Sequence, residues 1–244
     1  MNIHLINPNT TSSMTEQMIK VASEIANIDT IITGRTPKHG PVSIESHFDE
    51  AMSIVGVSEE ILQADAEGAD AMILACFGDP NIWAARELTD KPVLGIAQAA
   101  FIMASMVSTK FAVVTSLQRT VIIAEHLLDQ YGYSHLCPQV LAVDLPVLAL
   151  EDDTAKQAII NKCIEARDAK GNEAGAIVLG CGGMTHFKEE IEKEVGIPII
   201  DGVQSAVKLL EAMIGMGLKT SKYGDLAYPI AKPFMGDLKR FGSQ

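Results

Sequence analysis

The sequence predicts an α/β fold built from two similar parallel-sheet halves, each Rossmann-like or flavodoxin-like, related by a pseudo-two-fold axis. Short apolar runs rich in β-branched residues alternate with helical patterns throughout the 244 residues. One strand-to-helix unit also occurs twice at a fixed spacing, which is typical of a duplicated chain. Ligands bind at the carboxyl ends of parallel strands, so we expect the active site in the cleft between the halves.

Six apolar runs predict strands clearly, and two weaker runs complete the set. In chain order the eight predicted strands are Ile3–Asn7, Thr30–Thr33 (weak), Ala71–Ala75, Val93–Ile96, Phe111–Thr115, Val140–Val143 (weak), Ala176–Gly180 and Ile197–Ile200. The segments between them carry helical patterns with recognisable starts. Asp79-Pro80, for example, is interpreted as an N-cap followed by proline at the first helical position.

The duplication places two cysteines at equivalent positions. Residues 68–78 match residues 173–183 at a constant offset of 105 residues, so that Cys76 lies opposite Cys181. The neighbouring strand-to-helix segments match as well, one residue further apart. We therefore expect residues 1–105, with part of the C-terminal tail, to form one half and residues 106–218 the other, followed by an irregular tail over residues 219–244.

Composition limits the function classes. A formal net charge of −12 argues against nucleic acids and anionic membranes as partners, because both require clustered Lys and Arg. No run approaches the roughly 18 apolar residues of a membrane span, and the N-terminus lacks a signal-peptide pattern. We expect a cytoplasmic protein. The four cysteines form no CxxC pair, so no metal site is predicted.

Two opposed thiols suit the inversion of a carbon centre without a cofactor. One group removes a proton, a chemically similar group delivers one to the opposite face, and the reverse reaction exchanges their roles. A helix start after Cys76 and another after Cys181 would lower the thiol pKa. Glycines beside them would let backbone N–H groups reach an enolate oxygen. The alternative is two buried cysteines at repeated strand ends. Cys137 and Cys163 have no counterpart and are interpreted as structural.

Four motifs resemble the hydantoin/allantoin racemase branch of the aspartate/glutamate racemase superfamily. They are INPNT at 6–10, IESHFDEA at 44–51, CFGDP at 76–80 and LGCGGM at 179–184. The resemblance covers nearly the whole chain. It implies a metal-free, cofactor-free enzyme that inverts C5 of a 5-substituted hydantoin such as allantoin, self-associates and, with allantoin, belongs to purine catabolism.

The resemblance also implies roles for individual residues. Cys76 and Cys181 would be the acid/base pair. The residues expected to contact the ring and its carbonyl oxygens are Asn9, Phe77, Gly78, Thr115, Ser116, Gly182 and Gly183. Amino-acid racemases carry polar side chains after the two cysteines, whereas this chain has Phe77-Gly78 and Gly182-Gly183. A neutral cyclic amide therefore fits better than a zwitterion.

Several alternatives stay open. An amino-acid racemase of the Asp/Glu type, or a decarboxylase or isomerase on the same scaffold, would use the same cysteines. A ligand-binding or redox-sensing protein would show no turnover. The glycines around Cys181, with Asp201 downstream, partly mimic a dinucleotide fingerprint, but too few residues follow for the remaining half of that fold. His47 is a weaker candidate for substrate contact.

Overall fold

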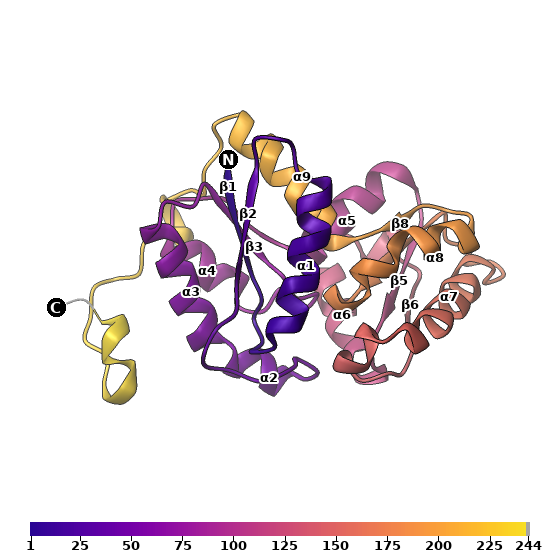
Figure 1. Cartoon of the computed structure of the whole chain (residues 1–244), viewed down its shortest axis with the longest axis horizontal. Coiled ribbons are helices and arrows are strands. Elements are labelled where there is room, and N and C mark those ends of the chain that lie inside the picture. The colour runs from indigo at the N-terminus through magenta and orange to yellow at the C-terminus, as the bar shows by residue number, and fades with distance from the viewer. Residues whose placement is uncertain (243–244) are drawn as a thin grey trace.

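The computed structural model describes residues 1–242, apart from the side chains of Glu151 and Asp153. These residues form two four-stranded parallel sheets with the same topology, ordered β2-β1-β3-β4 and β6-β5-β7-β8. Figure 1 shows the two sheets in separate lobes of an elongated molecule. The predicted α/β fold with two similar halves is confirmed.

The first half of the chain, with the first sheet, contains the elements that precede residue 108. They are β1 (Asn2–Ile6), α1 (Ser12–Ile25), β2 (Ile31–Arg35), α2 (His47–Met52), α3 (Ile54–Ala66), β3 (Ala71–Leu74), α4 (Ile82–Leu88), β4 (Val93–Gly95) and α5 (Ile96–Val107). Helices α3 and α4 pack on the outer face of this sheet through apolar residues such as Val57, Ile61 and Ile82.

The second half of the chain, with the second sheet, repeats this order with additional 3₁₀ turns. Its elements are β5 (Phe111–Thr115), α6 (Gln118–Tyr131), η1 (Ser134–Leu136), β6 (Gln139–Ala142), η2 (Val147–Glu151), α7 (Asp153–Arg167), β7 (Ala176–Gly180), η3 (Gly182–Phe187), α8 (Lys188–Val195), β8 (Ile199–Ile200) and α9 (Gly202–Gly215). Helices α7 and α8 cover its outer face. The turns η4 (Gly224–Leu226) and η5 (Gly236–Phe241) follow in the tail.

Burial explains why the strands could be predicted from the sequence. Every residue of the central strands β3, β5 and β7 is buried, so these strands appear as continuous apolar runs. The edge strands β2 and β6 are mostly half-buried and gave the weaker signals. All eight predicted strands are present within residues 1–242, with ends displaced by two residues at most.

Two helices cross between the lobes. Helix α5 follows the last strand of the first sheet but contacts β7 and β8 of the second, and α9 follows the last strand of the second sheet but contacts α1, β3 and β4 of the first. The two helices also pack on each other, with Gly202 against Ile96. One apolar core consequently runs through both lobes. The boundary predicted at residue 106 stays a prediction; these contacts place α9 with the first sheet.

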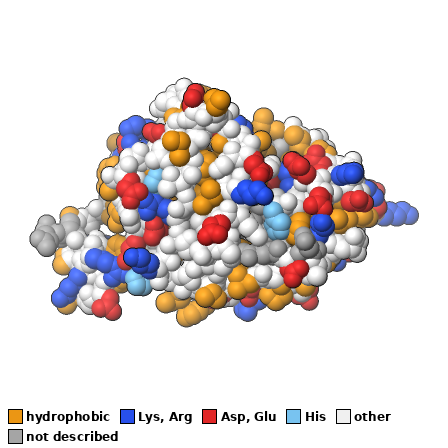
Figure 2. All heavy atoms as spheres, in the orientation of Figure 1, with side chains coloured by type: hydrophobic (Ala, Val, Ile, Leu, Met, Phe, Trp, Pro, Cys, Tyr) orange, Lys and Arg blue, Asp and Glu red, His pale blue; other side chains and the backbone are white. Residues whose placement is uncertain are grey.

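The C-terminal tail contacts the first lobe. The Lys219 Nζ donates to Asp90 Oδ2 at 2.6 Å, and Lys222 Nζ donates to the carbonyls of Arg86 and Glu87 at 2.5 and 3.1 Å. Its last part, at the edge of the molecule in Figure 1, contacts α3, where Arg240 Nε donates to Glu59 Oε1 at 2.5 Å. On the face drawn in Figure 2, acidic and basic side chains are intermixed. Among the residues described, no helix is both long and apolar enough to cross a bilayer.

Candidate active site

The two cysteines follow equivalent strands of the two sheets. Cys76 lies beyond the end of β3 and starts a tight turn, in which the N–H of Asp79 donates to its carbonyl at 3.0 Å. Cys181 comes directly after β7 and is the N-cap of η3, where the N–H of Met184 donates to its carbonyl at 3.1 Å. Both side chains are half-buried and neither is in a disulfide. The sequence duplication is therefore a duplication of thiol positions.

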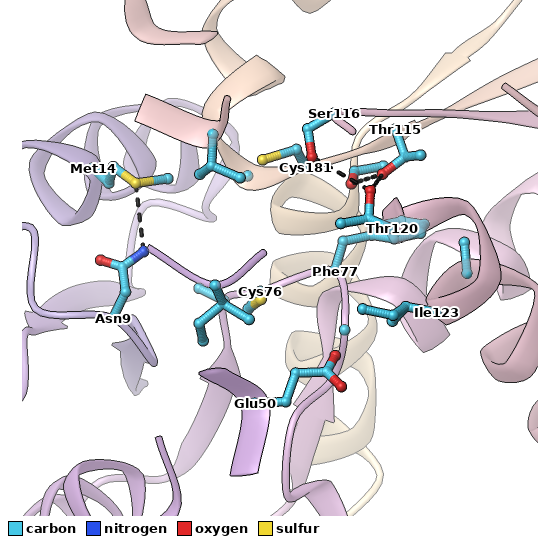
Figure 3. A pocket seen from close by; sticks show the side chains of 17 residues that line it. Asn9, Met14, Glu50, Cys76, Phe77, Thr115, Ser116, Thr120, Ile123 and Cys181 are labelled. Carbon is cyan, nitrogen blue, oxygen red and sulfur yellow. Dashed lines mark hydrogen bonds between the residues drawn. The ribbon is translucent and has the colours of Figure 1, made fainter. Parts of the chain in front are cut away.

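Both thiols line one pocket between the lobes. In Figure 3 Cys76 and Cys181 lie on opposite sides of it. Six of the seven residues predicted to contact substrate also line it, namely Asn9, Phe77, Gly78, Thr115, Ser116 and Gly182. Gly183 is not among the lining residues, although a Cβ added there would lie 3.7 Å from Cys181 Sγ. The pocket thus brings together elements of both halves.

Burial dominates the electrostatics of Cys76. Desolvation raises its pKa, the neighbouring Cys181, Glu50 and Asp79 act in the same direction, and a hydrogen bond from the backbone N–H of Gly78 opposes them. The expectation that a helix N-terminus lowers this thiol pKa is wrong, because α4 begins only at Ile82. The group that favours the Cys76 thiolate is the amide of Gly78.

Asp79 caps a different helix from the one predicted. Its own φ is +42°, and the cap of α4 is Asn81. The buried Asp79 carboxylate instead accepts hydrogen bonds at the start of α5, from the N–H groups of Ala97 (3.0 Å) and Gln98 (2.9 Å), and from the hydroxyl of Tyr131 in α6 (3.0 Å). Desolvation raises its pKa to about 6, against these three donors. Asp79 thereby joins the Cys76 turn to both lobes.

Replacement of Asp79 by asparagine is expected to destabilise the fold. An amide offers one acceptor atom, so its NH₂ group would face at least one of the three donors and leave it unpaired in the interior. The free energy of unfolding should fall by about 1–3 kcal/mol in urea titrations. Asp152→Asn is the matched control, because that exposed cap accepts one bond, from the Thr154 N–H at 3.0 Å. Equal effects of the two substitutions would contradict this assignment.

Polar side chains line both sides of the pocket. Asn9, from the loop after β1, uses its Oδ1 to accept from Asn7 and from the Thr11 N–H, both at 2.9 Å. Its Nδ2 has only the weak acceptor Met14 Sδ, at 3.4 Å. On the opposite side, Thr120 Oγ1 lies 3.0 Å from Thr115 Oγ1 and 3.5 Å from Ser116 Oγ. This arrangement can offer donors to oxygen atoms of a bound molecule.

The glycines after the cysteines have packing reasons as well. A Cβ on Gly78 would overlap Oε1 of Glu50, and one on Gly182 would come within 2.8 Å of Met18 Sδ. A larger residue at either position would therefore require the Glu50 or the Met18 side chain to move. Whether the backbone N–H groups of Gly78, Gly182 and Gly183 also face substrate stays a prediction.

Sequence reasoning missed Glu50, which supplies a carboxyl group to the pocket. It lies on α2, and its carboxyl group points into the pocket on the same side as Cys76 (Figure 3). Oε2 is 3.4 Å from Nδ1 of His47, whereas Oε1 is buried and, within the described part of the chain, has no hydrogen-bond partner. His47 itself does not line this pocket and is 64% exposed. The motif at 44–51 drew attention to the segment but not to this residue.

The segment that carries Glu50 connects the lobes. Glu45 Oε1 accepts from the N–H of Val147 in η2 at 2.9 Å, and the ring of His47 stacks on that of His126 in α6. The remaining lining residues that the sequence did not single out are Met14, Ile44, Ala75, Thr120, Ile123, Ala124, Val147 and Gly180. Apart from Thr120 and from Gly180 at the end of β7, these residues are apolar and come from loops and helices.

The other residues that the sequence analysis considered, Cys137, Cys163 and Asp201, lie outside the pocket. Cys137 and Cys163 are buried and free, consistent with a structural role. Asp201 caps α9 by accepting from the Gln204 N–H at 2.8 Å, and also accepts from Thr185 Oγ1 at 2.7 Å. Within the described part of the chain, no three His, Cys, Asp or Glu side chains are grouped so that they could hold a metal ion.

The chain is similar over nearly its full length to proteins of known activity. A hydantoin racemase of Rhizobium meliloti is 46% identical over 237 residues, which is 97% of this chain and 98% of the relative. The structure of an allantoin racemase from Klebsiella pneumoniae superposes with a TM-score of 0.95 at 46% identity, covering 99% of each chain. That of Pseudomonas fluorescens allantoin racemase gives 0.92 at 35%, covering 97% of this chain and all of the other.

Two equivalent parallel sheets that bring matching cysteines to one pocket, together with these similarities, define an isomerase of the racemase type. The family model described as Asp/Glu/Hydantoin racemase matches residues 3–210. The chain belongs to this family.

Proposed function

We propose that this protein racemises 5-substituted hydantoins, allantoin among them, by proton transfer between Cys76 and Cys181. The observation that carries the proposal is the position of the two thiols, on opposite sides of one pocket and at the ends of equivalent strands. The relatives named above support the substrate class. The Phe77-Gly78 and Gly182-Gly183 segments support it further, because the two residues that follow each cysteine carry no ionic side chain.

The proposed reaction balances with two thiols alone. One sulfur, as thiolate, removes the C5 proton and becomes a thiol, and the electron pair of the broken C–H bond forms an enolate. The other sulfur, as thiol, donates its proton to the opposite face of C5 and becomes the thiolate. The enolate oxygen needs donors, which Asn9 Nδ2 and the hydroxyl of Ser116 can supply. The reverse turnover restores the starting state.

Polarimetry with pure protein tests the activity. Optical rotation of (R)- and (S)-allantoin, and of each enantiomer of 5-benzylhydantoin, should decay to zero from both signs at a rate that a chelator does not change. In heavy water the product should carry deuterium at C5. Release of carbon dioxide from an α-carboxylated substrate without racemisation would instead indicate a decarboxylase. No turnover of any hydantoin would contradict the proposed function. The cytoplasmic address and self-association stay predictions.

A further inference from the structure

Glu50 presents an unused hydrogen-bond acceptor to the pocket. Its side chain is 18% exposed, and its Oε1 is buried with no hydrogen-bond partner among the residues that the structure describes. A buried acceptor left without a donor is unfavourable, and more so when it is charged. Burial raises the pKa of Glu50, while the neighbouring His47 opposes this rise. Such an oxygen in a pocket wall is typical of a group that is satisfied by a ligand.

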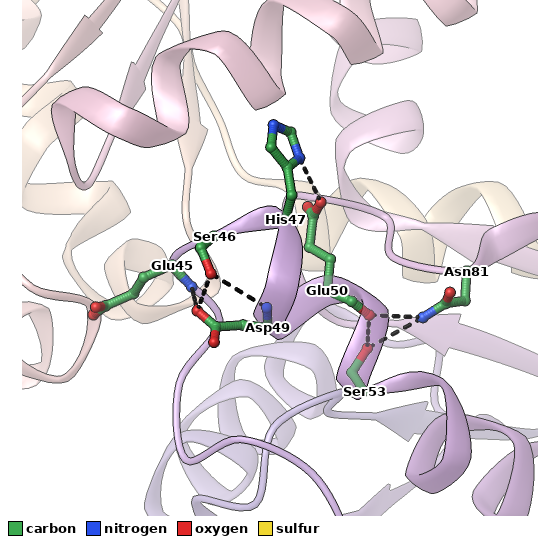
Figure 4. Close-up of polar contacts among 7 residues, drawn as sticks. All are labelled: Glu45, Ser46, His47, Asp49, Glu50, Ser53 and Asn81. Carbon is green, nitrogen blue, oxygen red and sulfur yellow. Dashed lines mark hydrogen bonds and ion pairs between the residues drawn. The ribbon is translucent and has the colours of Figure 1, made fainter.

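The local structure holds this oxygen in place. Glu50 lies on the short helix α2, whose N-cap Ser46 accepts from the Asp49 N–H at 3.2 Å, and the carbonyl of Glu50 accepts from Asn81 Nδ2 at 3.1 Å (Figure 4). Its Oε1 packs against the α-carbon of Gly78, where a Cβ would overlap it. The carboxyl group is therefore held beside Gly78, which follows Cys76 by two residues.

The other polar groups of the pocket differ from Glu50 in what they can offer. Asn9 Oδ1 already accepts two hydrogen bonds, and Thr115 Oγ1 donates to the carbonyl of Gly180 at 3.2 Å. The Thr120 hydroxyl donates to the carbonyl of Leu117 at 2.8 Å. Asn9 Nδ2 and the Ser116 hydroxyl can donate to carbonyl oxygens of a ligand. A hydantoin ring carries two carbonyls and two N–H groups, so it requires acceptors as well as donors.

We propose that Glu50 is a substrate-recognition residue whose Oε1 accepts a hydrogen bond from a ring N–H of the bound hydantoin. The inference rests on the proposed function for its substrate class. It assigns the pocket a preference for ring amides that carry a proton. It also gives the ring a fixed orientation, since a donor on one edge must meet the oxygen held beside Gly78.

A cycle of substrate methylation and residue replacement tests this contact. Binding of 5-benzylhydantoin, whose only N–H groups are those of the ring, would be measured by calorimetry in the Cys76→Ser/Cys181→Ser variant, which should not turn it over. Glu50→Leu should weaken binding about 10- to 100-fold, and Glu50→Gln, which keeps an acceptor, less. In the protein that retains Glu50, methylation of the ring nitrogen that contacts it should reduce the affinity by a similar factor. In Glu50→Leu the same methylation should reduce the affinity little further, because the contact is already lost.

A control variant and distinct outcomes separate failure of the Glu50 inference from failure of the proposed function. Glu24→Gln, at an exposed position of α1, should leave binding unchanged. Additive losses for both N1- and N3-methyl analogues, or wild-type affinity in Glu50→Leu, would overturn the role of Glu50. If Glu50→Leu does not fold, the same cycle with Glu50→Gln decides. When the wild-type protein racemises 5-benzylhydantoin but the losses are additive, only the Glu50 inference fails. When the hydantoin binds but is not racemised, the proposed function fails alone.

Discussion

Replacing Cys76 or Cys181 by serine is expected to reduce racemisation by about 100- to 10,000-fold or more, because each thiol supplies one of the two proton transfers. A hydroxyl in the same place is far less acidic and cannot take over either role at neutral pH. Both substitutions should preserve the fold, since serine differs from cysteine by one atom and both side chains border the pocket. Polarimetry of each variant with both enantiomers measures the loss.

Hydrogen exchange gives this experiment a second readout. A variant that keeps one functional thiolate can still remove the C5 proton from one face, so one of the two variants is expected to retain deuterium exchange with a single enantiomer. Cys163→Ala is the matched control, because that cysteine is fully buried in the core of the second lobe, away from the pocket. It should racemise at the wild-type rate. Full activity in Cys76→Ser would refute the mechanism.

The second large effect is expected on stability, at the crossing of α5 and α9. A Cβ on Gly202 would lie 2.5 Å from the carbonyl oxygen of Ile96 and 2.9 Å from its Cβ. Backbone atoms cannot move aside as a flexible side chain can, so Gly202→Ala must push the two helices apart. We expect the free energy of unfolding to fall by about 1–3 kcal/mol or more.

The same helix provides the control for this prediction. Gly215, the last residue of α9, is exposed, and an added Cβ would meet nothing within 4 Å. Gly215→Ala should therefore stabilise the protein by up to about 1 kcal/mol through helix propensity. Urea titrations of both variants measure the difference. Opposite signs are the expected result, and a neutral Gly202→Ala would mean that the two helices do not pack as closely as the structure shows.

Much of the fold followed from local sequence, because the central strands are buried on both faces and carry unbroken apolar runs. The duplication then located Cys76 and Cys181 without any structure. That the Asp79 carboxylate caps α5 could not be predicted from local sequence. Asp-Pro satisfies the local rule for a helix start, but the side chain is committed to a helix that begins after the next strand. A contact of that kind is decided by tertiary packing.

The pocket was only partly predictable for a related reason. Asn9 and Ser116 were expected from the family resemblance, and sheet topology explains why these residues, which follow β1 and β5, line the pocket. Glu50 is placed by the fold of residues 44–52 across the gap between the lobes, through Glu45 and His47. Gly78 illustrates the ambiguity of a glycine in a sequence, since Glu50 occupies the space that a side chain would need.

The exchange of α5 and α9 also has a consequence for how the chain is made. The first sheet is translated early, but the helix that covers its inner face ends at residue 215. At about 5–20 residues per second, roughly 5–20 s pass between the emergence of α5 and that of α9 from the ribosome. Throughout that interval an apolar surface of the nascent first lobe is open to chaperones or to aggregation, and native assembly is delayed until synthesis is nearly complete.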